Sequence, residues 1–262
     1  MKTYSEIIRV NELLLAFINH LNGLEHKFPN PTLYYLDECR SIMRIIIKNA
    51  EAIIVLADND TSYSHAASNI CRNVFEGAIR LVWLLHPESE TEREIRWLGM
   101  VKNAKASLET IEKEAAELGI ESNMLNAEQI IAMEEVVNKV SSHISARNKK
   151  VRFINGIPNF NQMTKESGYD FMYTMYRNLS GHVHLSHHSN RNYSADYGLN
   201  EGGILREWWS IYSILLFSLY ASSTRYFEIH YEEHETGLTE NHMQAMGKEI
   251  DKILAFAKSL IN

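Results

Sequence analysis

Hydrophobic residues recur at helical spacing through most of the chain. Between Tyr4 and Leu24, for example, apolar residues stand three or four positions apart, as they do on one face of an α-helix. The same pattern predicts helices over about residues 33–57, 63–85, 91–118, 126–146, 204–231 and 239–260. Only 4 prolines and 12 glycines interrupt the chain, which favours long helices over an all-β fold with many turns. The pattern therefore predicts an all-α helical bundle.

Polar residues mark where several of these helices begin or end. The run D-N-D-T-S at residues 58–62 ends the second predicted helix and can cap the third. Thr91 with Glu94, and Asn126 with Gln129, form the capping-box pattern that is typical of a helix start. These signals place the beginnings of the fourth and fifth helices.

The helical pattern fails over residues 147–165, which predicts an irregular connection. A short helix is expected from about Lys165, followed by a polar loop over residues 186–203. We expect one all-α domain over residues 1–262, in which the charged helices at 91–146 can project as a hairpin.

The composition limits the classes of protein that the chain can belong to. Its net charge of −7 argues against a protein that coats nucleic acid non-specifically, because such binding depends on positive charge, although a local basic site stays compatible. Cys39 and Cys71 are too few for a disulfide framework.

The most apolar segment, residues 208–221, is shorter than the roughly 20 residues of a membrane-spanning helix, so we expect a buried core helix. With no signal-peptide pattern at residues 1–6, we expect a cytoplasmic protein without membrane contact.

The segment Y-R-N-L-S-G-H-V-H-L-S-H-H-S, residues 176–189, combines one arginine with four histidines. Arg177 and His184 lie seven positions apart, about two helical turns, so they can share one face with Ser180 between them. His182 lies off this face unless the helix ends before it. Arginine binds phosphate through its planar guanidinium, and histidine transfers protons near neutral pH. Such a pair can activate a ribose 2′-hydroxyl against the neighbouring phosphodiester without a metal ion.

This spacing resembles the ribonuclease motif of the HEPN superfamily, in which an arginine and a polar residue precede a histidine by four to six intervening residues. Arg177 and Asn178 match the beginning of the motif, and either His182 or His184 matches its end. The segments around this motif and at residues 72–85 also resemble an uncharacterised bacterial HEPN-like family of unknown function. In that family a tyrosine, a Leu-Ser pair and the later histidine recur, which favours His184 over His182.

The resemblance implies a helical bundle, usually a homodimer, with the arginine and histidine facing the dimer cleft. Many members are metal-independent endoribonucleases of toxin–antitoxin or anti-phage defence systems, so it implies an RNA substrate, no cofactor and a possible antitoxin or defence partner. Arg177 would bind the scissile phosphate and His184 would be the acid and base. Asn178, Ser180 and Tyr176 would support them. Other proteins of this fold have lost catalysis and only bind nucleotides or partners.

A second polar group lies on the predicted helix at 63–85. Arg72, Glu76 and Arg80 are four positions apart, so they share one face. Because apolar residues flank them, we expect partial burial and pairing, and Glu76 can orient Arg177 from a neighbouring helix. The alternative is a solvated ladder of charges. Arg72 and Glu76 are therefore predicted as supporting residues.

Other interpretations of these residues stay open. Arg177 and His184 can belong to a structural polar network with Ser180 and Tyr176, in a non-catalytic interaction or adaptor protein. The sequence H-x-x-E-H at His230–His234 matches the inverted signature of zinc hydrolases. Zinc needs a third protein ligand, and few residues follow, so we expect a charged helix terminus and no metal there.

The densest basic run, R-N-K-K-V-R at residues 147–152, contains Lys149, Lys150 and Arg152. These side chains can contact an RNA backbone, although a solvated loop is the commoner role of such a run. His187 and His188 lie in the predicted polar loop without a carboxylate or cysteine pair to complete a metal site.

Overall fold

The computed structural model describes a chain that is helical in all its regular elements. The described residues are 2–26, 30–119, 127–147, 153–154, 156–174, 176–177, 179, 201–234, 244–245, 247–248, 250–252 and 255. No strand occurs among them, so the predicted all-α class is confirmed. The chain divides into two compact units, Met1–Leu85 with Phe160–Asn262 and His86–Asn159. That the whole chain, residues 1–262, forms a single domain stays a prediction.

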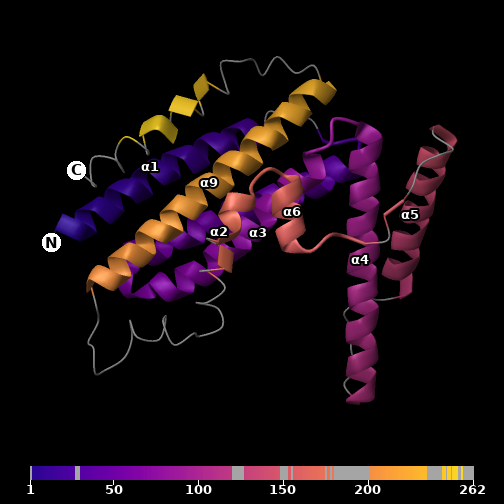
Figure 1. Cartoon of the computed structure of the whole chain (residues 1–262), viewed down its shortest axis with the longest axis horizontal. Helices are drawn as coiled ribbons and strands as arrows, with labels where there is room; N and C mark the ends of the chain where they lie inside the picture. Colours follow the sequence, from indigo (N-terminus) through magenta and orange to yellow (C-terminus); the bar gives the residue numbers. More distant parts are fainter. Residues whose placement is uncertain are drawn as a thin grey trace. The chain divides into compact units, whose positions relative to one another are not determined.

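The first unit is a bundle in which α1, α2, α3 and α9 lie alongside one another (Figure 1). Its elements are α1 (Lys2–Glu25), α2 (Tyr34–Asn59), η1 (Thr61–Tyr63), α3 (Ser64–Leu85), α6 (Phe160–Glu166), η2 (Asp170–Met172) and α9 (Glu201–His234). The helix α3 is central because it contacts α2, α9 and α6. The largest fully buried side chains of the unit include Phe17, Tyr35, Phe75, Trp83, Trp208 and Tyr226. Burial of these rings, together with the aliphatic side chains around them, stabilises the bundle.

The two ends of α3 are stabilised in different ways. Before it, the Asp60 carboxylate accepts a hydrogen bond from the Ser62 backbone N–H at 2.8 Å, which caps the 3-10 turn η1. At its other end, the Leu85 carbonyl accepts hydrogen bonds from the Arg225 Nε and Nη2 atoms at 3.0 and 2.9 Å. An arginine of α9 thus satisfies a carbonyl that the helix end leaves without a partner. The predicted end of this helix at residue 85 is confirmed.

The prediction that a short helix begins at about Lys165 is wrong. Instead, α6 occupies Phe160–Glu166 and is followed by Gly168, whose φ of 77° lies in the left-handed region that favours glycine. The Tyr169 N–H bonds to the Thr164 carbonyl at 2.8 Å and the Gly168 N–H to the Lys165 carbonyl at 3.1 Å. This pair of bonds is the Schellman motif of a helix C-terminus. The chain then turns through η2 into a helical segment that holds Tyr173, Thr174, Tyr176, Arg177 and Leu179.

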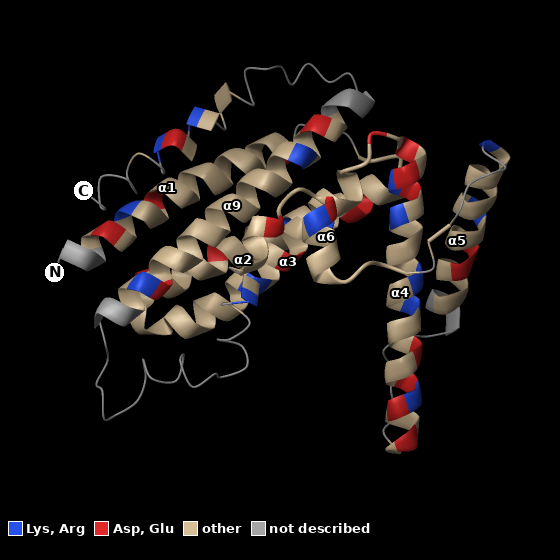
Figure 2. Cartoon of the chain, in the orientation of Figure 1, with Lys and Arg blue, Asp and Glu red and all other residues tan. Residues whose placement is uncertain are grey.

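The second unit contains α4 (Glu90–Glu117) and α5 (Ala127–Arg147), which contact each other. Both signs of charge alternate along α4 (Figure 2). The predicted capping box of Thr91 and Glu94 is wrong, because Ser89 is the N-cap residue and no side chain caps the helix. Glu94 is buried instead. Asn126, predicted to cap α5, lies outside the described residues, and projection of the pair as a hairpin stays a prediction.

The long helix α9 confirms the expected core role of residues 208–221. Trp208 is fully buried, and its indole N–H donates to the Thr61 carbonyl at 2.7 Å, whereas the neighbouring Trp209 is only half-buried. Within the described ranges, no helix combines the length and the hydropathy that a membrane span requires. The predicted C-terminal helix is helical at each described residue from 244 to 255.

Candidate functional site

A network of three side chains joins α3 to the helical segment that carries the Arg177 motif. The Arg72 Nε atom donates to the Glu76 Oε1 atom at 2.9 Å, and Arg72 Nη2 donates to the Tyr176 hydroxyl at 3.1 Å. The same hydroxyl donates to Glu76 Oε1 at 3.1 Å. Each member of this triangle therefore contacts the other two. The spacing of four within α3 brings Arg72 and Glu76 together, and the tertiary fold adds Tyr176.

The triangle holds Arg72 firmly as a cation. Burial acts to lower the pKa of its guanidinium, but the hydrogen bonds to Glu76 and Tyr176 outweigh it, so the pKa of Arg72 is raised. The guanidinium carbon also lies 5.3 Å from the centroid of the Tyr176 ring, within the range of a cation–π interaction. The side chains of Arg72 and Glu76 are each 22% exposed, so their predicted partial burial and pairing are confirmed. Arg80 is 49% exposed and 3.9 Å from Glu76, which makes it the most solvated member of the predicted ladder.

Aromatic rings hold Tyr176 on its other sides. Its ring centroid lies 4.4 Å from that of Phe160, 6.2 Å from that of Phe75 and 5.8 Å from that of Tyr173, on which it stacks. The helix α6, which supplies Phe160, is itself attached to α3. The Trp83 indole N–H donates to the Glu166 carboxylate at 2.7 Å. The sequence pattern does not single out Phe160 or predict that these rings pack on Tyr176, although aromatic residues recur through residues 160–176.

Arg177 points away from this network. It directly follows Tyr176, and consecutive helical residues project about 100° apart around the axis. Its side chain is exposed, and no hydrogen bond or ion pair joins it to any other residue of the described set. Leu179, two positions later, is buried. The segment is therefore packed through Tyr176 and Leu179 while the Arg177 guanidinium faces solvent, where it can bind an anion such as phosphate.

The remaining predicted site residues lie outside the described residues. They are Asn178, Ser180, His182 and His184 of the motif, His187 and His188 of the polar loop, and Lys149, Lys150 and Arg152 of the basic run. The sequence also suggested that Glu76 pairs with Arg177 directly. Glu76 instead contacts Arg72, Arg80 and Tyr176, the residue that precedes Arg177 in the chain.

The H-x-x-E-H segment lies at a helix terminus, as expected, but its first histidine is buried. The helix α9 does end at His234, whose side chain is outside the described part, but His230 is fully buried. Its ring packs edge-on against Tyr226, with the centroids 4.4 Å apart. In the part of the chain that the structure describes, no group of three or more histidine, cysteine, aspartate or glutamate side chains could hold a metal ion.

Other reactive groups of the first unit are buried in the core. Cys39 and Cys71 are both buried and neither is in a disulfide. Burial raises the pKa of the Cys71 thiol, which disfavours the nucleophilic thiolate. Glu207 is also buried, and its carboxylate accepts from the Ser64 and Ser68 hydroxyls at 2.7 and 3.3 Å. These contacts indicate a structural role, because buried polar groups that are hydrogen-bonded hold helices in register.

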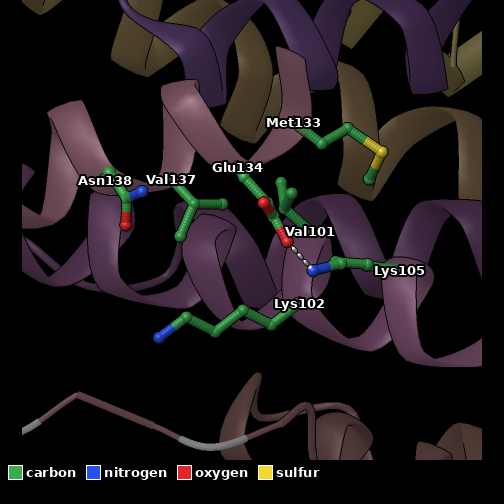
Figure 3. A pocket seen from close by; sticks show the side chains of 7 residues that line it. All are labelled: Val101, Lys102, Lys105, Met133, Glu134, Val137 and Asn138. Carbon is green, nitrogen blue, oxygen red and sulfur yellow. Dashed lines mark hydrogen bonds and ion pairs between the residues drawn. The ribbon is translucent and has the colours of Figure 1, made fainter. Parts of the chain in front are cut away.

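A separate pocket of about 350 Å³ lies between α4 and α5 in the second unit (Figure 3). It is lined by Val101, Lys102, Lys105, Met133, Glu134, Val137 and Asn138. Lys105 forms an ion pair with Glu134 across the two helices. At the end of α5, Arg147 donates to Glu90 of α4 at 2.9 Å, so this first residue of the basic run is already paired.

Comparison with known proteins identifies a family to which the chain is similar. Residues 38–200, which are more than half of the chain, match the model of a family described as "Family of unknown function (DUF5677)". The matched range contains the whole Arg72–Glu76–Tyr176 triangle and Arg177. No curated protein and no solved structure matches the chain significantly.

Proposed function

The chain belongs to the family of unknown function DUF5677, and we propose that it is a metal-independent endoribonuclease of the HEPN type. In this proposal it acts in the cytoplasm, as a homodimer, in a bacterial toxin–antitoxin or anti-phage defence system. RNA is its substrate, and an antitoxin or another defence protein is a partner.

The observation that carries this proposal is the orientation of Arg177. Tyr176 is held on three sides by Arg72, Glu76 and stacked aromatic rings, so the backbone of the next residue is fixed. The Arg177 guanidinium is exposed beside that fixed point. A cation on a rigid support can bind a phosphodiester in a defined orientation, which is what phosphoryl transfer requires.

The proposed reaction uses the ribose itself as nucleophile. The 2′-oxygen forms a bond to the adjacent phosphorus while the bond from phosphorus to the 5′-oxygen breaks. His184 takes the proton of the 2′-hydroxyl, and the leaving 5′-oxygen receives a proton from a histidine or from water. The products are a 2′,3′-cyclic phosphate and a 5′-hydroxyl. Arg177 stabilises the negative charge on the non-bridging oxygens, and it does so at any working pH because a guanidinium stays protonated.

The other motif residues have supporting roles in this proposal. Asn178 and Ser180 hydrogen-bond the phosphate or hold the histidine, and His182 is the alternative to His184. Arg72, Glu76 and Tyr176 are positioning residues that act through the backbone of Arg177. Lys149, Lys150 and Arg152 bind the RNA backbone outside the reacting phosphate.

The test is incubation of the pure protein with total RNA in excess EDTA, beside Arg177→Ala and His184→Ala proteins. Fragments that end in 2′,3′-cyclic phosphate, made by the unaltered protein alone, are the expected result. A His182→Ala protein separates the two candidate histidines. Cleavage that is unchanged in the Arg177→Ala protein and in both histidine variants would overturn the proposal.

A second candidate function is a non-catalytic interaction protein, and the pocket between α4 and α5 favours it. Val101, Met133 and Val137 give this pocket an apolar lining, and Lys102 and Glu134 add charges of both signs. Apolar hollows with charged borders suit an inserted side chain of a partner protein. Overexpression separates the two functions. A ribonuclease should slow growth and Arg177→Ala should relieve that effect, whereas an interaction protein should leave growth independent of Arg177.

A further inference from the structure

Aromatic side chains form a continuous row through the first unit, ending at the arginine site. Successive ring centroids are 6.1 Å apart from Phe171 to Phe217, 6.2 Å from Phe217 to Phe75, 6.2 Å from Phe75 to Tyr176 and 5.8 Å from Tyr176 to Tyr173. Tyr169 and Phe160 flank the row at 5.0 Å from Phe217 and 4.4 Å from Tyr176. We call these rings the aromatic row.

Part of the aromatic row lies at the surface. Phe171 is 64% exposed, although it contacts Phe217 and Tyr169. Tyr169 and Tyr173 are half-buried. Burial raises the pKa of the Tyr169 hydroxyl, and Tyr220, which is exposed on α9, raises it further. The central ring of the row, Phe75, is fully buried, so the exposed and half-buried rings form its two ends and are supported from the core.

The charges beside the row differ between its two ends. At the Tyr176 end, Arg72 lies 5.3 Å from the ring centroid and Arg177 is exposed. At the Phe171 end, Asp170 is exposed, and Glu228 and Arg225 add one charge of each sign near Tyr169, which gives a phosphate less support there. The whole chain carries a net charge of −7, so the positive charge at Tyr176 is local. A ligand that fits this arrangement presents flat, uncharged rings to Phe171 and a phosphate to the arginines.

From these contacts we propose that the aromatic row is a stacking platform for the bases of single-stranded RNA. Bases would stack on Phe171 and Tyr173, and this would bring the following phosphodiester to Arg177. Aromatic rings bind every base through its π-face, so the platform selects unpaired strands rather than a particular sequence. A duplex keeps its bases stacked on each other and cannot use it. This inference rests on the proposed ribonuclease function, whose substrate class it defines.

The direct test measures binding without cleavage. The probe is a fluorescent single-stranded 2′-O-methyl oligonucleotide of about ten nucleotides, a length within the usual range of such sites. It lacks the free 2′-hydroxyl, so it cannot be cut. Fluorescence anisotropy gives the Kd of the full chain for this strand and for its duplex. We expect Phe171→Ala and Tyr173→Ala each to raise the Kd for the single strand by about 5- to 150-fold, the usual effect of losing one base–aromatic contact.

Matched variants separate stacking from folding. Tyr63 is 49% exposed and has no ring contact with another described residue, so Tyr63→Ala should leave the Kd unchanged. Phe171→Trp and Tyr173→Phe keep a ring at each position and should bind as the unaltered protein does. Circular dichroism checks that Phe171→Ala, a change at an exposed side chain, leaves the helices intact.

The outcomes distinguish this inference from the proposed function. Weaker binding by both alanine variants supports the platform, whether or not the protein cleaves RNA in the EDTA assay. Cleavage together with unchanged binding by Phe171→Ala and Tyr173→Ala overturns the platform and leaves the ribonuclease. Equal affinity for the duplex, or no binding of the single strand by the unaltered protein, also overturns the platform, and the exposed rings then become a candidate surface for a protein partner.

Discussion

Arg72 donates a hydrogen bond to the hydroxyl of Tyr176 at 3.1 Å, although 104 positions separate the two residues. Glu76 completes the contact by accepting from both. The triangle therefore fixes the segment of the Arg177 motif against the central helix α3. A partly buried network of this kind is worth more when all of its members are paired, since removal of one leaves each of the others with one bond fewer.

Replacing Tyr176 with phenylalanine should lower the free energy of unfolding by about 1 kcal/mol, the usual net value of a hydrogen-bonded hydroxyl. The ring stays, so its packing on Phe160 and Tyr173 is retained. Only the bonds to Arg72 and Glu76 are lost. Urea denaturation followed by circular dichroism measures the change.

Tyr173→Phe is the matched control for this prediction. Tyr173 stacks on Tyr176 but makes no side-chain hydrogen bond to another described residue. Its variant should therefore keep the unfolding midpoint of the unaltered protein. Equal losses in the two variants would show that the triangle contributes no specific stability.

Arg177→Ala should leave stability within about 0.5 kcal/mol of the unaltered protein, because the side chain is exposed and makes no hydrogen bond or ion pair with another described residue. Arg72→Ala should instead destabilise the fold, since it removes two hydrogen bonds from the partly buried triangle. Thermal unfolding measures both, with the exposed Arg206→Ala as a control. A loss in Arg177→Ala as large as that in Arg72→Ala would identify Arg177 as part of the structural network and would weaken its proposed role in phosphate binding.

The sequence predicts the long helices well because their apolar stripes extend over many turns. The boundaries of α1, α2, α3 and α9 differ from the prediction by only a few residues at each end. The site is harder to predict, since its contacts depend on the tertiary fold. Spacing alone brings Glu76 to Arg72, whereas nothing local indicates that Tyr176 joins them or that Arg225 satisfies the end of α3.

The short helix α6 was missed for a different reason. Its 7 residues are too few for helical spacing to be recognised. The glycine that ends it, within the sequence E-S-G-Y at residues 166–169, was the available signal. The sequence likewise gives no sign that the aromatic residues from Phe160 to Tyr176 pack together, because their contacts depend on the tertiary fold.

Gly168→Ala should destabilise the protein by about 1–2 kcal/mol, because an L-residue is strained in the left-handed conformation that Gly168 adopts at φ 77°. The substitution acts on the turn that leads from α6 into Tyr176. Gly23 provides the opposite control, since it lies exposed inside α1 with nothing within 4 Å of an added Cβ atom. Gly23→Ala should stabilise by roughly 0.5–1 kcal/mol. Both changes are measured as shifts in Tm, and a stabilising Gly168→Ala would contradict the observed turn.

Glu94 should make the protein less stable as the pH rises above the ordinary carboxyl range. Its pKa is raised from 4.5, first by burial and then by repulsion from Glu90, while Arg147 and His143 oppose the shift. The folded state thus holds this proton more tightly than the unfolded chain does, so stability falls as the pH rises from about 4.5 through the raised pKa. Glu94→Gln removes the titrating group. The free energy of unfolding of this variant should therefore fall less than that of the unaltered protein as the pH rises from about 4 to 7. Urea denaturation across this range measures the difference, with Glu92→Gln, an exposed change in the same turn, as control. Parallel pH profiles for the Glu94→Gln and unaltered proteins would contradict the prediction.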